Sequence, residues 1–169
     1  GSFELIKMLQ KLNATGIGLL TGILMIGLSL GFFYSGMESG SIIQYSIYIV
    51  YAMGITWAVY RFSRTEKNDH KFGSYFQQGF KCFIVVTLLM IMYTFVFNKM
   101  HPEFTEQIAA VYKEQLIKKG NAMPPEIESN VGEMKKSYLT ILIAASVFQY
   151  LIIGAVITLV SSFLFMKRK

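Results

Sequence analysis

The chain of 169 residues is 53% hydrophobic and 15% charged, whereas about a quarter of the residues in an average soluble domain are charged. The charges are segregated, and blocks of about 20 residues without any charge predict membrane-spanning helices. The net charge of +6 does not indicate nucleic acid as a partner, because most of the basic excess lies beside these blocks. A single cysteine, Cys82, excludes an internal disulfide and a cysteine-based metal cluster.

The N-terminal segment, residues 3–13, places apolar residues at helical spacing with Lys7 and Lys11 between them. One interpretation is a short helix in the headgroup region of the membrane, with its lysines toward anionic lipid. The alternative is that these residues form the first turns of the first span.

The first span is predicted over residues 14–34, which carry no charge. Two pairs of glycines at a spacing of four residues favour close helix packing: Gly18 with Gly22, and Gly27 with Gly31. Packing within one subunit and the interface of a homo-oligomer are both compatible with this pattern. A short Gly/Ser-rich link without Lys or Arg follows, and it predicts an outward-facing turn.

The second span is predicted over residues 42–60 and is rich in aromatic residues. Trp57 and Tyr60 lie next to Arg61, as expected of an aromatic belt at the membrane interface. Tyr45, Tyr48 and Tyr51 recur every third residue, a pattern that indicates either a pocket lining or packing against neighbouring helices.

A short basic loop at residues 61–81 separates the second span from the third. Its basic residues are Arg61, Arg64, Lys67, Lys71 and Lys81. A positive loop between two spans is retained on the cytoplasmic side, so the loop determines the orientation of the chain. The same residues are candidates for contact with anionic lipid or an acidic partner, although orientation alone would also explain them.

The third span is predicted over residues 79–98, and the segment 99–137 that follows is predicted to be extracytoplasmic. A proline near a helix start, acids in the first turn and Gly120 after the last turn predict a helix there. A second helix restarts near Pro125 and continues into the fourth span. We therefore expect an amphipathic αα-hairpin over about 102–137, lying on the membrane or packed on itself.

The fourth span is predicted over residues 139–166, with Gln149 near its middle as a candidate for helix packing through interhelical hydrogen bonds. The chain ends in the basic residues 167–169. Because the basic excess falls on the side of both termini and of the 61–81 loop, the sequence predicts an all-α integral membrane protein of four spans, a single domain over 1–169, with both ends inside.

No catalytic, cofactor-binding or metal-binding set is recognisable in the sequence. No Asp, Glu, Lys, Arg or His lies at the apolar centre of a span, which argues against an ion-coupled transporter. His70 and His101 fall on opposite sides of the predicted membrane, so they cannot share a metal ion. His101, Glu103 and Glu106 offer few metal ligands and are more typical of a solvated helix start. We therefore expect no enzyme activity and no cofactor.

The run F-G-S-Y-F-Q-Q-G-F-K at Phe72–Lys81, which opens the third span after a basic loop, resembles the DUF4199 family of small four-span membrane proteins from Bacteroidota. The long linker between spans three and four and the basic C-terminus are also similar to that family. The resemblance implies a bacterial inner-membrane location. It carries over no catalytic residue, because the function of the family is unknown. It also implies an accessory role beside a polyprenol-phosphate glycosyltransferase.

These patterns together predict a non-enzymatic accessory or interaction subunit of the inner membrane, with a glycosyltransferase or other envelope protein as partner. The alternative is a small carrier or flippase-like protein for a lipid or lipid-linked solute. A third hypothesis is a pore formed by a homo-oligomer of this chain. Nucleic acid is not expected as a partner.

Overall fold

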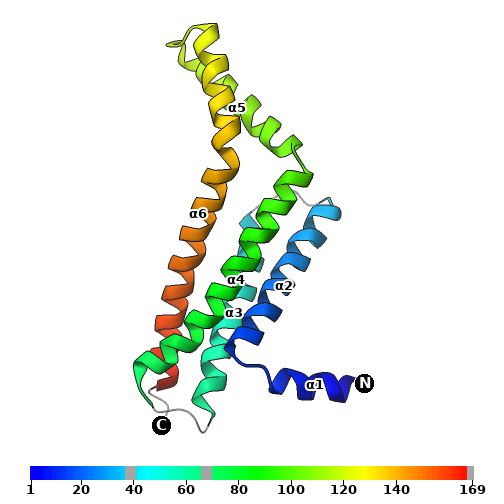
Figure 1. The fold of residues 1–169 in the computed structure, drawn as a ribbon, viewed down its shortest axis with the longest axis vertical. Coiled ribbons are helices and arrows are strands. Elements are labelled where there is room, and N and C mark those ends of the chain that lie inside the picture. The colour runs from blue at the N-terminus through cyan, green and yellow to red at the C-terminus, as the bar shows by residue number, and fades with distance from the viewer. Residues whose placement is uncertain (37–40, 66–69, 167–169) are drawn as a thin grey trace. The chain divides into compact units, whose positions relative to one another are not determined.

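The computed structural model describes residues 1–36, 41–65 and 70–166, and within these ranges every regular element is an α-helix (Figure 1). The helices are α1 (Ser2–Gln10), α2 (Ala14–Tyr34), α3 (Ser41–Ser63), α4 (Phe72–Met100), α5 (Glu103–Lys119) and α6 (Pro124–Met166). The predicted all-α class is confirmed for this part of the chain.

Four of these helices are long and apolar enough to cross a membrane: α2, α3 from Ile42 onward, α4 and α6. They contain the four spans predicted from hydropathy, and they indicate a multi-pass membrane protein. The first predicted span coincides with α2, whereas the other three are parts of longer helices.

The α4 helix shows why hydropathy underestimates helix length. The third span was expected from residue 79, but α4 begins at Phe72. Tyr75 is buried, and its ring meets that of Phe62 edge to face with centroids 5.3 Å apart. Phe72 packs against Phe163 of α6 at 4.8 Å. These contacts stabilise the first turns of α4, and they come from parts of the chain that are far apart in sequence.

Packing divides the structure into two compact units, Gly1–Met90 with Gln149–Lys169, and Ile91–Phe148. The first unit contains α1, α2, α3, the first part of α4 and the last part of α6. Its core side chains include Ile17, Met25, Tyr51, Ile55, Val59, Tyr75 and Val86.

Small residues bring the helices of the first unit close together. A Cβ added to Gly18 would lie 2.7 Å from the carbonyl oxygen of Cys82, so α2 and α4 approach backbone to backbone there. At Gly154 of α6, an added Cβ would lie 2.5 Å from the hydroxyl of Tyr51 and 2.7 Å from the Phe83 ring. Close approach of this kind lets dispersion contacts accumulate where lipid provides no hydrophobic drive between helices.

Tyr51 joins α3 to α6 in the same unit. The side chain is fully buried, and its hydroxyl donates a hydrogen bond of 2.8 Å to the carbonyl oxygen of Tyr150. The rings of Tyr51 and Tyr150 meet edge to face at 5.5 Å, and Tyr48 lies 5.8 Å from Tyr150. The tyrosines at every third position were expected either to line a pocket or to pack against neighbouring helices. Tyr48 and Tyr51 pack against α6, whereas Tyr45 is exposed.

The N-terminal helix α1 is separate from α2. Asn13 caps α2, and its side-chain oxygen accepts a hydrogen bond of 2.8 Å from the amide of Gly16. Figure 1 shows α1 lying across the end of α2 instead of continuing its direction. Because α1 ends at Gln10 and α2 begins at Ala14, the interpretation of residues 3–13 as the first turns of the first span is wrong. The apolar side chains of Leu5, Ile6 and Met8 are exposed on α1.

The second unit contains the end of α4, α5 and the first part of α6. Gly120 ends α5 in a left-handed conformation, with φ 67°, as its predicted position after the last turn requires. The ammonium of Lys135 on α6 lies 2.9 Å from a carboxylate oxygen of Glu106 on α5, and Ala109 and Ile127 are buried. The second arm of the predicted hairpin is the beginning of α6, which continues without a break.

Candidate functional site

The most distinctive polar feature of the first unit is a basic pocket of about 740 Å³. Four cationic side chains line it, and they come from three parts of the chain: Lys11 from the α1–α2 link, Arg61 in the last turn of α3 with Arg64 just after it, and Lys81 from α4. The other lining residues are Leu12, Asn13, Ala14, Ala58, Phe62, Thr65 and Gln78. Among the residues that the structure describes, none of those lining the pocket is acidic.

The positions of these cations follow from helix packing. The edge-to-face contact between Phe62 and Tyr75 sets the end of α3 beside the start of α4. The close approach of Gly18 to Cys82 sets the first turns of α2 beside the turn of α4 that carries Lys81. After α3 ends, the amide of Arg64 donates to the carbonyl of Arg61 over 3.2 Å, so one further turn keeps both arginines at the pocket.

The electrostatics of the pocket favour an anion. Basic side chains gathered in one cleft raise the local positive potential, which attracts an anionic ligand. The start of α2 adds to this field, because Asn13 and Ala14 line the pocket and the N-terminal end of a helix carries partial positive charge. Arg64 also lies over the Tyr60 ring, 5.6 Å from its centroid, which orients its guanidinium.

The five basic residues singled out from the sequence therefore have different positions. Arg61, Arg64 and Lys81 line the pocket together. Lys71 is exposed and is not among the lining residues, and Lys67 lies outside the described residues. Lys11 was not among the five candidates of the 61–81 loop. One interpretation of residues 3–13, a helix in the headgroup region, did put Lys11 with Lys7 toward anionic lipid, but the sequence did not show that it shares a pocket with Arg61, Arg64 and Lys81.

The four glycines predicted to lie at helix contacts differ in whether another helix is close to them. Gly18 and Gly22 lie against α4, where added Cβ atoms would meet Cys82 and Leu89. At Gly27 and Gly31, an added Cβ would find no atom within 4 Å. Gln149 is exposed on α6, and its role in interhelical hydrogen bonding stays a prediction.

A cluster of buried hydroxyl groups on α6 was not recognised in the sequence. Thr158, Ser161 and Ser162 are buried in the first unit. The hydroxyl of Ser161 lies 3.3 Å from that of Thr56, whereas those of Thr158 and Ser162 have no hydrogen-bond partner among the described residues. The sequence analysis did not single out these three residues, and only helix packing shows that they are buried.

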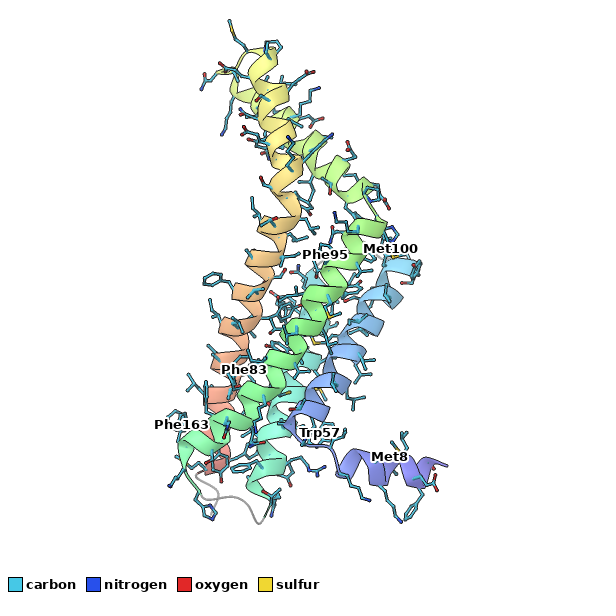
Figure 2. The ribbon with its side chains drawn as sticks, viewed as in Figure 1. Met8, Trp57, Phe83, Phe95, Met100 and Phe163 are labelled. Carbon is cyan, nitrogen blue, oxygen red and sulfur yellow. The ribbon has the colours of Figure 1, made fainter. Side chains whose placement is uncertain are left out.

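A second, apolar groove of about 500 Å³ runs along α3 beside the end of α6, lined by Ile49, Ala52, Met53, Thr56, Trp57, Tyr60 and Phe165. Figure 2 shows Trp57 at the end of the first unit from which α1, with Met8, extends; Phe163 lies at the same end. An indole at the end of a span is typical of the membrane interface, as the sequence predicted for Trp57.

His101, Glu103 and Glu106, which the sequence analysis considered as possible metal ligands, are not grouped around one metal position. His101 Nδ1 lies 2.9 Å from a carboxylate oxygen of Glu103, whereas Glu106 pairs with Lys135. A hydrogen bond from its own backbone amide, and then the one from His101, holds the pKa of Glu103 below its usual value. Within residues 1–36, 41–65 and 70–166, no three His, Cys, Asp or Glu side chains are grouped to hold a metal ion.

Four apolar helices, exposed apolar faces and a basic cluster at the ends of several helices define the class of small, multi-pass helical membrane proteins. The chain belongs to the DUF4199 family, described as a protein of unknown function, which it matches over residues 16–167. The resemblance inferred from Phe72–Lys81 is thus confirmed. No curated protein matches the chain, and no solved structure does.

Proposed function

We propose that this protein is a non-enzymatic accessory subunit of the bacterial inner membrane that engages an anionic partner through its basic pocket. The single observation that supports this function is the convergence of Lys11, Arg61, Arg64 and Lys81 on one cleft, in which no described lining residue is acidic. A role in orientation alone requires only that these residues lie on one side of the membrane, and it does not require them to share a pocket.

The proposed orientation puts both termini and the pocket on the cytoplasmic side. Lys and Arg beside the spans are retained there, and the pocket cations belong to the segments that flank α2, α3 and α4. The hairpin of α5 and the start of α6 then lies outside. A membrane-associated glycosyltransferase or another envelope protein is the proposed partner.

A comparison of co-purified proteins tests this function. The test variant replaces Lys11, Arg61, Arg64 and Lys81 with Gln, and the control variant replaces four exposed lysines of the second unit with Gln: Lys113, Lys118, Lys119 and Lys136. Each variant is crosslinked in native membranes and purified, after labelling has shown that its orientation is unchanged. We expect recovery of the partner to fall at least about tenfold for the pocket variant only. Equal recovery with both variants would contradict the proposal.

The buried hydroxyl groups favour a second candidate function, a small carrier for a lipid or lipid-linked solute. A carrier needs polar groups at membrane depth, and Thr158 and Ser162 are buried without partners in the described structure. Reconstituted vesicles test this alternative by the movement of a fluorescent anionic lipid between leaflets. Movement that is catalysed by the native chain and lost in Thr158→Val with Ser162→Ala would favour the carrier over the accessory subunit.

A further inference from the structure

We infer that the basic pocket binds the phosphate-bearing headgroup of an anionic phospholipid, held by Lys11, Arg61, Arg64 and Lys81. This inference rests on the proposed function and specifies the chemistry that the basic end of the first unit recognises. The lipid would stay bound at the pocket, and the protein would thereby be held where the membrane contains anionic lipid.

The lining of the pocket matches a phosphodiester. Phosphate oxygens accept hydrogen bonds and carry negative charge; Lys11, Arg64 and Lys81 supply charged donors, and Arg61 adds positive charge to the same lining. The side chains of Asn13, Thr65 and Gln78 add neutral polar groups in the same lining. A volume of about 740 Å³ exceeds the needs of a single inorganic ion and lies in the range of pockets for organic ligands.

The first turn of α2 contributes to the same site. Ala14, the first residue of α2, lines the pocket, and the first amides of a helix have no acceptor within the helix. The Asn13 side chain accepts from Gly16, and the Asn13 carbonyl accepts from Ile17, so the cap occupies the amides deeper in the first turn. A phosphate beside Ala14 would meet the positive end of the helix as well as the cations.

The depth of the pocket favours a lipid over a soluble phosphate. Its lining residues lie at the start of α2 and the end of α3, two helices that could cross a membrane, so the proposed threading puts the pocket near the lipid headgroups. The adjoining α1 exposes Leu5, Ile6 and Met8, side chains that suit the boundary between headgroups and acyl chains. Lipid phosphates are concentrated at this depth.

The apolar groove on α3 offers a place for an acyl chain. Tyr60 lines that groove, and Arg64, which lines the basic pocket, lies over the Tyr60 ring. Ile49 and Met53 continue the groove along α3 away from the charged end. The pocket and the groove share no lining residue in the described part of the chain, and the contact between Arg64 and Tyr60 joins them; a phospholipid whose phosphate binds Arg64 would bring one chain near this ring, which a soluble phosphate would not do.

Native mass spectrometry of the purified 169-residue chain in detergent tests this inference. The probes are phosphatidylglycerol, phosphatidylcholine and inorganic pyrophosphate, each titrated separately. The pocket variant combines Lys11→Gln, Arg61→Gln and Lys81→Gln. The matched control combines Lys113→Gln, Lys118→Gln and Lys119→Gln, which removes the same charge from α5. Thermal unfolding in detergent shows that each variant is folded.

We expect phosphatidylglycerol to bind the native chain and the control equally, with phosphatidylcholine binding far more weakly. Each basic residue near an anionic surface changes affinity about fivefold, so the pocket variant should lose affinity for phosphatidylglycerol by about a hundredfold. The single change Lys11→Gln, which lies outside the helices, should lower affinity about fivefold and serves if the triple variant does not fold.

Three results would overturn the inference. Equal losses in the pocket and control variants would show a general charge effect, and equal binding of the two lipids would show that the phosphodiester charge is not recognised. Pyrophosphate binding as tightly as phosphatidylglycerol would identify a soluble ligand. The assay contains no protein partner, so it measures lipid binding separately from the recovery of a partner in membranes. If lipid binding fails while the pocket variant still loses its partner in membranes, an acidic protein is the direct occupant and only the lipid inference falls.

Discussion

At the scale of single residues, the buried hydroxyl groups of the first unit differ in whether they are hydrogen-bonded. The Tyr51 hydroxyl donates to the Tyr150 carbonyl, and Thr21 and Thr87 return their hydroxyls to backbone carbonyls one turn earlier in their own helices. Thr158 and Ser162 have no such partner in the described part of the chain. A buried polar group without a partner lowers stability, whereas a satisfied one contributes modestly.

Ser162→Ala should therefore leave stability unchanged or raise it by up to about 1 kcal/mol, because it removes a buried hydroxyl that has no partner among the described residues. Tyr51→Phe is the comparison, since it removes the donor to Tyr150 with little change of shape, and it should lower stability by about 1 kcal/mol. Thermal unfolding in one detergent measures both. A clear loss of stability in Ser162→Ala would mean that its hydroxyl is used, as a carrier would require.

Glu103 offers a test of pH dependence outside the membrane-spanning segments. Hydrogen bonds from its own amide and from His101 hold its pKa below the usual value, so the ionised form is favoured when α5 is folded. This contribution is present above the ordinary carboxyl pKa and is lost as pH falls through the lowered one. NMR titration should show the Glu103 carboxyl titrating below a typical glutamate. In His101→Ala the midpoint should rise, and no rise would show that the His101 contact does not operate in solution.

At the scale of helices, α2 presents two different glycine pairs. Gly18 and Gly22 lie against α4, whereas added Cβ atoms at Gly27 and Gly31 would contact nothing within 4 Å. The pairs look alike in sequence because both have the same spacing. The first therefore fits packing inside one chain, and the second is the part of α2 that a homo-oligomer could use.

Gly18→Val should lower the free energy of unfolding by about 1–3 kcal/mol, because its Cβ would collide with the Cys82 carbonyl and force α2 away from α4. Gly27→Val should leave the stability of the monomer unchanged. Thermal unfolding and size-exclusion chromatography with light scattering measure both variants. If Gly27→Val shifts the oligomeric state, that face is an interface between copies of the chain; if Gly18→Val is as stable as the native chain, the close approach of α2 and α4 is wrong.

At the scale of the whole molecule, the threading through the membrane sets what the basic pocket can meet. The proposed orientation follows from the distribution of Lys and Arg beside the spans. It puts the pocket inside the cell and the turn between α5 and α6 outside.

Labelling of single cysteines tests this threading in a Cys82→Ser background. We expect Thr65→Cys to react with a membrane-impermeant reagent only after the cells are opened, and Asn121→Cys to react in intact cells, because the two sites lie on opposite sides of the proposed membrane. An unmodified Cys82→Ser chain is the control for background labelling. Reaction of both sites in intact cells would exclude the four-span threading.

Much of this architecture could be predicted from the sequence because it depends on local composition. Runs of apolar residues specify helices that can cross a bilayer, since every backbone polar group must be paired within the helix there. Gly120 ends α5 as predicted because glycine adopts a left-handed conformation without steric cost. Arg61, Arg64 and Lys81 could be predicted as contact candidates because a basic residue next to an apolar run is recognisable from local sequence alone.

What only the tertiary structure decided is which of these residues lie together. Lys11 is separated from Lys81 by two helices in sequence, and it reaches the same pocket because Gly18 lets α2 approach α4 at Cys82. The burial of Thr158 and the early start of α4 at Phe72 likewise depend on contacts between distant segments. Hydropathy and charge depend on residues that are neighbours in sequence, so they predict which segments can cross a membrane and on which side the loops lie. A shared pocket or a buried hydroxyl group arises from side-chain packing between helices, which local composition does not specify.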